Sequence, residues 1–185
     1  MIKSKKDLAK YLEEDRKALH MERKRPRLFQ DEVWKYEIFL RKNEYYHNVD
    51  GFGHNFLRLW YAFRQHRLGI RLGFHVPINV CDEGLHINHS GLLIINSHAK
   101  IGKRFNVHQG VNIGQNIEPQ DAPIIGDDVF VGPGVKIYGK VVIADRIAVA
   151  AGSVVTHSFT TPDITIGGVP AKILNSNRGN PFIDK

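Results

Sequence analysis

The chain has 185 residues, of which 42% are hydrophobic and 24% are charged, and it carries a formal net charge of +7 at pH 7. This composition is typical of a globular protein, and no run of about 18 apolar residues is present that could cross a bilayer as a helix. Cys81 is the only cysteine, which excludes an intrachain disulfide. The first residues are polar and lack the apolar core of a signal peptide, so we expect a cytoplasmic protein.

Charge and glycine are distributed unevenly along the chain. Residues 1–75 contain 17 Lys and Arg against 10 Asp and Glu, whereas residues 76–185 contain 9 of each. The first part has 4 Gly and 1 Pro, and the second has 13 Gly and 7 Pro. We therefore expect an α-helical N-terminal region over residues 1–75, a glycine-rich domain over residues 76–175 and a C-terminal tail over residues 176–185. The basic residues of the first part are interleaved with acids, which argues against a nucleic-acid partner.

Three helices are expected in the N-terminal region. Ser4 and Asp7 form a capping pattern at the start of the first helix, and further helices are expected at about residues 31–43 and 55–68. The third helix carries a largely aromatic stripe at helical spacing, formed by Phe56, Leu59, Trp60 and Phe63. Stripes of this kind are typical of a packing surface, and we interpret this one in that way.

From about residue 76 the hydrophobic period changes to six residues. Aliphatic side chains with this spacing occupy positions Ile95, Ile101, Val107, Ile113, Ile125, Val131, Ile137, Ile143, Val149 and Val155. A second apolar row precedes the first by two residues, at Ala99, Phe105, Val111, Val129, Val135, Val141 and Ile147. A six-residue repeat predicts short strands joined by tight turns, with three strands and 18 residues in each turn of a coil. Residues 114–124 break the repeat and are expected to form a protruding loop.

Five motifs in the repeat region carry a family resemblance. They span residues 85–95, 99–102, 109–114, 125–134 and 167–173, and the resemblance covers about residues 75–175. In these motifs the sequence resembles the hexapeptide-repeat acyltransferases, and within them the serine acetyltransferase-like group. The resemblance implies a mainly β fold, a left-handed parallel β-helix preceded by an α-helical N-terminal region. It also implies an O-acetyltransferase that uses acetyl-CoA as cosubstrate and forms a homotrimer, with helices that would permit trimers to pair into hexamers.

A histidine is the residue type best suited to remove the proton of a hydroxyl that attacks a thioester, because the pKa of imidazole lies near the working pH. Of the ten histidines, His89 matches the general base of the family, and its alternative role is to fill a corner of the coil. The aspartate that orients this histidine in the family is absent from the matching stretch, residues 76–79. We expect Asp82, ahead of Glu83, to supply the orienting carboxylate. His108 is the second candidate base, although a surface or interface role is favoured for it.

Pro133 and Ala151 match the CoA-contacting positions of the family. They are 18 residues apart, one full turn of the coil, so we expect them to stack. Lys172 matches a basic residue that neutralises a CoA phosphate, and solubility is its alternative role. The sequence has no phosphate-binding loop of the Walker or dinucleotide type and no Cys/His cluster with metal-ligand spacing, so ATP, NAD and metal are not expected.

The resemblance implies serine as the acceptor, but two departures favour a sugar of a surface polysaccharide precursor. Asp121 and Ala122 precede Pro123, where the family has a basic residue and a histidine that hold the amino acid. Asn88 replaces the acid beside the catalytic histidine and is our candidate substrate contact. A non-catalytic trimeric binding or assembly protein is the alternative function. The positive N-terminal region is expected to attract anionic CoA or a nucleotide-linked sugar.

Overall fold

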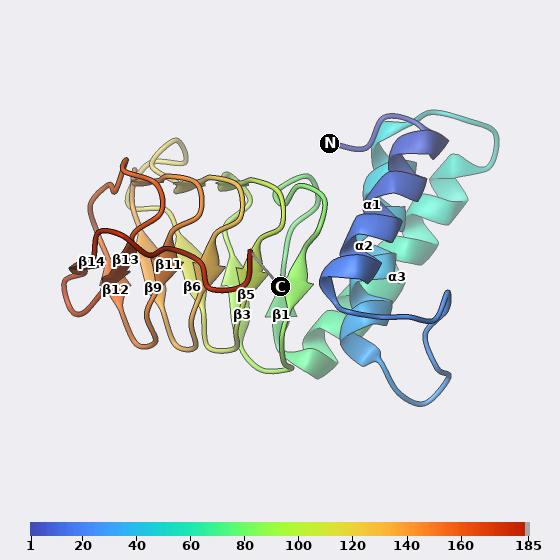
Figure 1. The fold of residues 1–185 in the computed structure, drawn as a ribbon. Coiled ribbons are helices and arrows are strands. Elements are labelled where there is room, and N and C mark those ends of the chain that lie inside the picture. Colours follow the sequence, from blue (N-terminus) through green and yellow to red (C-terminus); the bar gives the residue numbers. More distant parts are fainter. Residues whose placement is uncertain (184–185) are drawn as a thin grey trace.

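The computed structural model describes residues 1–183, which form a helical layer at one end of the molecule and a stack of short strands beside it (Figure 1). The helical layer contains α1 (Lys5–Ala18), α2 (Glu32–Asn48) and α3 (His54–Leu72). Ser4 caps α1 by accepting a hydrogen bond from the backbone NH of Asp7 at 3.0 Å, as the capping pattern predicts. The three expected helices are therefore present. None of the helices within residues 1–183 has the length and apolar character needed to cross a membrane.

The strand stack consists of short strands that belong to three sheets. In chain order they are β1 (Phe74–His75), β2 (His86–Ile87), β3 (Leu93–Ile95), β4 (Lys100–Ile101), β5 (Asn106–Val107), β6 (Asn112–Gly114), β7 (Ile124–Ile125), β8 (Phe130–Val131), β9 (Lys136–Tyr138), β10 (Val142–Ile143), β11 (Ala148–Val149), β12 (Val154–Val155), β13 (Thr165–Gly167) and β14 (Lys172–Asn175). Sheet A has the order β1-β3-β6-β9-β12, sheet B the order β4-β7-β10, and sheet C the order β2-β5-β8-β11-β13-β14. The chain visits the three sheets in turn, and only β13 and β14 pair antiparallel.

The interior of the strand stack is filled by the two rows that the six-residue period predicts. Every residue of both rows is at most 4% exposed. The main row is in register from turn to turn, for example Ile101 with Ile125 and Ile125 with Ile143 across sheet B. Most strands are only two or three residues long, so one inward side chain from each strand supplies most of the interior. This geometry is the physical reason for the repeat.

Buried charged side chains join the helical layer to the first turn of the strand stack. Arg41 of α2 is fully buried and donates to Asp15 of α1, with 2.7 Å between Nε and Oδ2, and to Glu44 at 3.1 Å. It also donates to the two backbone carbonyl oxygens of residues 81–82, at 2.8 and 2.7 Å. Asp15 accepts hydrogen bonds from the backbone NH groups of residues 84–85 at 2.8 and 2.9 Å. The backbone of the first turn is thus held by side chains of α1 and α2.

The apolar stripe of α3 is exposed, so our interpretation of it as a packing surface is wrong for the described chain. The exposed fractions are 71% for Phe56, 67% for Leu59, 47% for Trp60 and 56% for Phe63. The helix packs on α2 through its opposite face, where Gln65 and Gly69 are buried. Helical spacing identifies a common face, but it does not say what that face contacts.

Two segments leave the regular strand stack. Residues 115–123 project between β6 and β7 (Figure 1). Residues 176–183 run back along sheet C, where Asn180 donates through Nδ2 to the carbonyl oxygen of Asp128 at 2.7 Å. The ring of Phe182 lies 5.1 Å from that of Phe130. Residues 184 and 185, the end of the expected tail, lie outside the described residues.

Candidate active site

One corner of the strand stack carries several of the predicted site residues. The inward residues of β2, β5, β8 and β11 are in register across sheet C. Two positions after these inward residues, where sheet C ends, lie His89, Gln109, Pro133 and Ala151, which we call the corner row. Neighbouring strands are about 4.8 Å apart, so His89 and Pro133, two turns apart, are separated by roughly 10 Å along the stack. The corner row is therefore an extended surface with His89 at its first turn.

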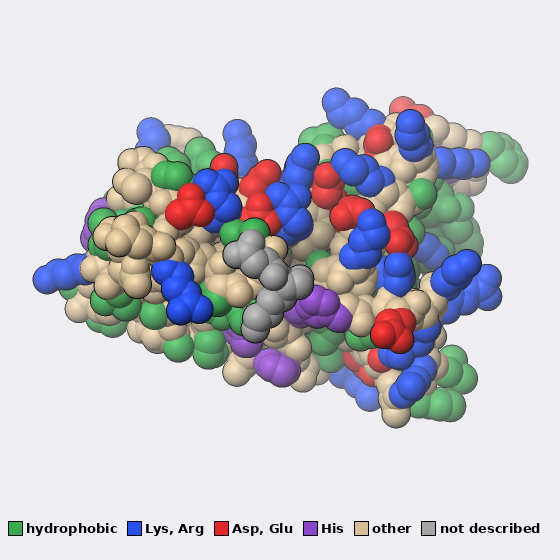
Figure 2. Space-filling view, viewed as in Figure 1, with side chains coloured by type: hydrophobic (Ala, Val, Ile, Leu, Met, Phe, Trp, Pro, Cys, Tyr) green, Lys and Arg blue, Asp and Glu red, His purple; other side chains and the backbone are tan. Residues whose placement is uncertain are grey.

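His89 is exposed and lies beside the second candidate base. The rings of His89 and His108 are 5.7 Å apart between centroids, and His108 in turn contacts the ring of Phe130 at 5.4 Å. Histidine side chains gather at this part of the surface in Figure 2. Within residues 1–183 the imidazole of His89 forms no hydrogen bond, which leaves both of its ring nitrogens open to an incoming group.

Burial lowers the pKa values of two histidines that lie near His89. Burial lowers the pKa of His86 to about 4, and the charges of His20, His108 and His89 add to this effect. The pKa of His108 is also lowered, first by burial and then by the charge of His89. Within the described part of the chain, no three His, Cys, Asp or Glu side chains are arranged to hold a metal ion.

Asn88, the candidate substrate contact, is engaged with the next turn of the stack. Its Nδ2 donates to Oδ1 of Asn106 at 2.6 Å and to the carbonyl oxygen of Val107 at 3.1 Å. These bonds fix the residue that directly precedes His89. Asn88 therefore holds the start of the corner row, and its remaining exposed surface is available to a ligand.

A cavity beside His89 is lined by residues from both parts of the molecule. It has a volume of about 390 Å³ and is bordered by Asp31, Glu32 and Trp34 on one side and by residues 86–90 on the other. The carboxylate of Asp31 accepts from Arg23 at 2.6 Å and from the backbone NH of Arg27 at 2.8 Å. Although burial opposes the shift, these bonds lower the pKa of Asp31, so it is a charged group that is already paired.

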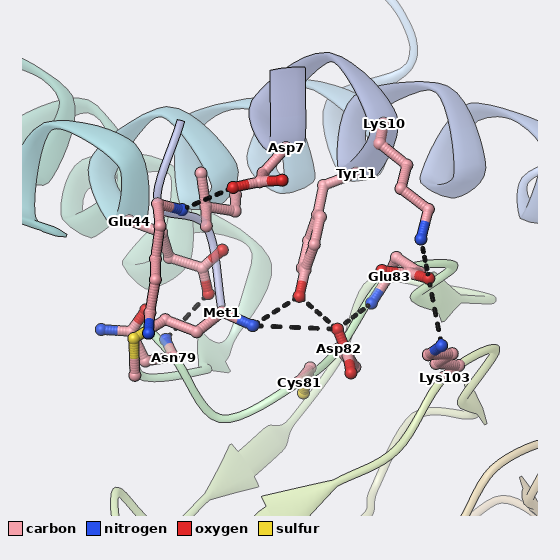
Figure 3. A network of polar contacts seen from close by, with 12 residues as sticks. Met1, Asp7, Lys10, Tyr11, Glu44, Asn79, Cys81, Asp82, Glu83 and Lys103 are labelled. Atoms are coloured by element: carbon pink, nitrogen blue, oxygen red, sulfur yellow. Dashed lines mark hydrogen bonds and ion pairs between the residues drawn. The ribbon is translucent and has the colours of Figure 1, made fainter. Parts of the chain in front are cut away.

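Within residues 1–183 the expected pairing of Asp82 with His89 is not found, and Figure 3 shows the groups that contact Asp82 instead. Asp82 accepts a hydrogen bond from the hydroxyl of Tyr11 and another from the backbone NH of Glu83 at 3.0 Å, and the ammonium group of Met1 lies 4.0 Å away. Burial opposes the shift, but these contacts lower the pKa of Asp82. The physical reason is the order of the sheets within one turn of the stack. Asp82 follows Cys81, which bridges to Ile101 of sheet B, whereas His89 follows β2 of sheet C. The two residues therefore lie at different corners, and the strand β2 separates them.

Glu83, the second expected carboxylate, is also directed elsewhere. Its Oε1 accepts from Lys10 at 2.7 Å, and the ammonium group of Lys103 lies 3.5 Å from the same atom. Both lysines approach Glu83 from the side that faces away from Asp82, as Figure 3 shows. Neither of the two carboxylates predicted from the sequence therefore orients His89 in the described chain.

The predicted CoA-contacting residues lie along or beside the corner row. The carbonyl oxygen of Pro133 accepts from the backbone NH of Gly152 at 2.9 Å, so Pro133 and Ala151 stack on neighbouring turns as their spacing predicts. Lys172 is exposed at the start of β14 and is paired in register with Gly167 at the far end of sheet C. The corner row and Lys172 together therefore extend along the length of the stack, with His89 at the first turn and Lys172 near the last.

The predicted acceptor loop leaves the stack at a different corner. Residues 115–123 connect sheet A to sheet B, whereas the corner row lies between sheets C and A. Ala122 is buried, and the carbonyl oxygen of Pro123 accepts from the backbone NH of Lys100 at 3.0 Å. Within one chain, Asp121 and Ala122 are therefore not part of the corner row.

Glu37 is a buried acid beside the candidate site, and it was not among the residues predicted from the sequence. Its Oε1 accepts from the backbone NH of Ile87 at 3.1 Å, two residues before His89, and its Oε2 has no hydrogen-bond partner within residues 1–183. Burial, followed by the charge of Asp15, raises the pKa of Glu37. The available signal was the helical spacing of Glu37, Arg41 and Glu44, which places three charged residues on one face.

Part of the strand stack matches a known family of proteins. The family model for the bacterial transferase hexapeptide (six repeats) matches residues 122–157. Serine acetyltransferases of Synechococcus elongatus and Bacillus subtilis are 29% and 31% identical over 94 residues, which cover 50% and 49% of this chain. The chain spans only 38% and 42% of the length of these two relatives.

Solved structures agree over most of the chain. A serine acetyltransferase of Neisseria gonorrhoeae in complex with serine has a TM-score of 0.68 and 25% identity, covering 92% of this chain and 70% of that one. A serine acetyltransferase in complex with CoA has a TM-score of 0.70 and 19% identity, covering 92% and 71%. Residues 122–157 thus carry the hexapeptide repeat of bacterial transferases, and the chain resembles the serine acetyltransferases in sequence and in fold.

Proposed function

We propose that this protein is an acetyl-CoA-dependent O-acetyltransferase with His89 as its general base. The observation that carries the proposal is the corner row, in which an exposed histidine shares one edge of the stack with Pro133 and Ala151. The resemblance to serine acetyltransferases, including one solved with CoA and one solved with serine, supports the reaction class.

The reaction needs one group that first accepts and then returns a proton. The acceptor hydroxyl gives its proton to a ring nitrogen of His89 while its oxygen attacks the carbonyl carbon of the acetyl thioester. The carbon–sulfur bond then breaks, the CoA sulfur takes the proton from the imidazolium, and an acetyl ester and CoA thiol are formed. His89 ends the cycle unprotonated, ready for the next acceptor.

His89 is a better candidate for this role than His108. Burial lowers the pKa of His108, and a lower pKa makes an imidazole a weaker base. His89 is more exposed and has open ring nitrogens within the described chain. His108 lies close enough to limit the volume beside His89, and we assign it a role in shaping the site.

The corner row is suited to an extended cosubstrate such as acetyl-CoA. Pro133 and Ala151 present small or rigid side chains, so the backbone at two successive turns is accessible to a pantetheine arm. Lys172 is exposed near the far end of the same sheet and is positioned to neutralise a phosphate. We infer no resident metal or cofactor.

Serine is the acceptor that the relatives support, and a sugar hydroxyl is the second candidate. Asn88 favours the sugar, and so do Asp121 and Ala122 if a neighbouring subunit of the proposed trimer brings them to the site, because none of the three is a cation for an amino-acid carboxylate. Such a sugar would belong to a surface polysaccharide precursor.

The finer assignments of fold and assembly are part of the same proposal. We infer that the strand stack is a left-handed parallel β-helix and that the protein works as a cytoplasmic homotrimer, with the helices available to pair trimers. The division into a helical region (1–75), a catalytic repeat domain (76–175) with a protruding loop (114–124) and a tail (176–185) follows from the change in period and composition.

Replacement of His89 tests the proposed chemistry. We expect His89→Ala to lower kcat by about 10²–10⁴-fold in an assay of thiol release from acetyl-CoA, with CoA binding by calorimetry unchanged. The matched control is His98→Ala, because His98 is an exposed histidine at another corner and should leave kcat as in the wild type. Full activity in His89→Ala together with loss in His108→Ala would transfer the role to His108. No thiol release by the wild type with any acceptor would favour a non-catalytic binding protein.

The acceptor is identified by the same assay over L-serine, homoserine, free sugars and nucleotide-linked sugars. The acceptor used in the cell should reach a kcat/KM of roughly 10⁴ M⁻¹s⁻¹ or more. That value with L-serine would exclude the sugar assignment, and turnover restricted to sugars would exclude serine.

A further inference from the structure

The exposed face of α3 is an apolar feature that the proposed function does not use. Its outward residues at helical spacing, Phe56, Leu59, Trp60, Phe63 and Ile70, are between 47% and 71% exposed. Leu28 and Phe29 of the preceding loop, at 79% and 87% exposed, add to the same end of the molecule. Contiguous apolar patches on this scale mark interaction surfaces.

Arginines border this apolar stripe, and Glu32 of α2, the acid that lines the adjoining groove, is already paired with Lys35 at 3.6 Å. Residues 51–81 contain no Asp or Glu, and α3 carries Arg64, Arg67 and Arg71 beside the stripe, whereas Arg58 lies on the face of Gln65 toward α2. None of these four arginines forms an ion pair within residues 1–183. The surface is therefore both apolar and positively charged.

The arginines are ordered against the aromatic rings. The guanidinium of Arg64 lies 5.0 Å from the ring centroid of Phe39 and 5.7 Å from that of Trp60, and the guanidinium of Arg67 lies 6.0 Å from that of Phe63. A groove of about 440 Å³ runs between these groups and Leu28. The guanidinium groups thus lie over the aromatic rings, and both arginines remain exposed.

We propose that this face of α3 docks on the surface of a bilayer that contains anionic phospholipids. An amphipathic helix with aromatic and aliphatic residues on one face and arginines along its border is the pattern that inserts at the level of lipid headgroups. A second copy of the chain fits less well, because a two-fold contact would bring arginine rows together with no acid in residues 51–81 to balance them. This docking does not depend on acetyl transfer.

Docking would also bring the candidate site near the lipid surface. The last residue of α3, Leu72, accepts a hydrogen bond through its carbonyl oxygen from the backbone NH of Gly91 at 2.9 Å. Gly91 is two residues from His89, so the helix and the corner row are directly connected. A docked molecule therefore presents its first turn close to molecules held at the membrane.

Vesicle binding of the full-length chain tests the proposal. We expect cosedimentation with vesicles made of equal parts phosphatidylglycerol and phosphatidylcholine, and at least about tenfold weaker binding to vesicles of phosphatidylcholine alone. The chain has two tryptophans, and Trp34 is only 3% exposed. Brominated acyl chains should therefore quench Trp60 and leave the emission of Trp34 unchanged.

Two double variants separate the apolar and charged contributions. Leu59→Glu with Phe63→Glu, and separately Arg67→Glu with Arg71→Glu, should each weaken vesicle binding by at least about tenfold with an unchanged circular dichroism spectrum. The control is Ile117→Glu, because Ile117 is 82% exposed in the protruding loop and carries no part of the α3 face. Its binding should stay within about twofold of the wild type.

Three results would overturn the proposal. The first is no cosedimentation with the anionic vesicles, and the second is equal binding by the wild type and the two double variants. The third is a lipid-free oligomer that dissociates in the Leu59→Glu, Phe63→Glu variant by analytical ultracentrifugation, because the face would then be an interface between copies. Each result is independent of whether the protein transfers acetyl groups.

Discussion

His86 shows how burial controls the charge of a residue beside the candidate site. It lies in the last strand before His89, and Nδ2 of Asn106 lies 3.4 Å from its Nδ1. The ring also meets that of His20 edge-on at 5.7 Å. Because burial lowers its pKa to about 4, His86 is neutral in the folded protein at neutral pH.

This burial makes stability depend on pH in a definite direction. In the unfolded chain His86 has its ordinary pKa of 6.5, so between pH 6.5 and 4 the unfolded chain binds the extra proton. The free energy of unfolding should therefore fall as the pH is lowered through this window, by up to about 3 kcal/mol from this residue. Urea unfolding followed by circular dichroism at pH 7, 6, 5 and 4 measures the slope.

The variant His86→Gln isolates the contribution of the residue. Glutamine can retain a polar contact with Asn106 but does not titrate, so its unfolding free energy should fall less between pH 7 and 4 than that of the wild type. Parallel pH profiles for the two proteins would show that other groups cause the acid sensitivity.

Individual roles could be predicted from sequence only where a local motif encodes them. His89 was identified from the residues around it, and whether it acts as the base stays a prediction. The partner carboxylate was misassigned because Asp82 is seven positions before His89 along the chain but at another corner of the triangular turn. Distance along a coil does not measure distance across it.

At the scale of elements, Arg41 is a buried polar link between α2 and the strand stack. Its fully buried guanidinium has carboxylate partners in Asp15 and Glu44 and two carbonyl partners in the first turn. Removing the guanidinium would leave buried carboxylates without a counter-charge. We therefore expect the charged cluster to stabilise the attachment of the helical layer.

We expect Arg41→Met to lower the free energy of unfolding by about 3–5 kcal/mol, measured by urea denaturation. The matched control is Arg104→Met, because Arg104 forms a two-bond pair with Asp128 on the surface, at 2.5 and 2.6 Å. That substitution should cost less than about 1 kcal/mol, since an exposed ion pair is screened by water. Equal losses in the two variants would contradict the role assigned to the buried cluster.

Elements were predictable to the extent that their side-chain period is unique. A six-residue period implies three strands per turn, and both apolar rows are buried as expected. The helical period of α3 was equally clear, yet its apolar stripe is exposed in the structure. An amphipathic pattern identifies an apolar face, but the pattern is the same whether that face contacts protein or lipid. The carboxylates of α1 and α2 were missed because a buried ion pair and a solvated one look alike in sequence.

For the whole molecule, the net charge of +7 should affect the capture of an anionic substrate. We expect the KM for acetyl-CoA to rise as NaCl is increased, because salt screens attraction between the basic chain and the CoA phosphates. Acetyl-pantetheine, which lacks those phosphates, is the matched control, and its KM should respond little. Equal salt responses for the two substrates would show that the charge of the protein does not assist CoA binding.

The two ends of the strand stack are closed by different structures. At the first turn, Asp15, Glu37 and Glu44 accept hydrogen bonds from the backbone NH groups of residues 79–87. At the last turn, β14 runs antiparallel to β13, and the following segment folds back over sheet C. Unpaired strand edges recruit strands from other molecules. With the first end covered by side chains of α1 and α2, end-to-end pairing into fibres is blocked there, and any added strand would meet the stack at β14, the outermost strand of sheet C.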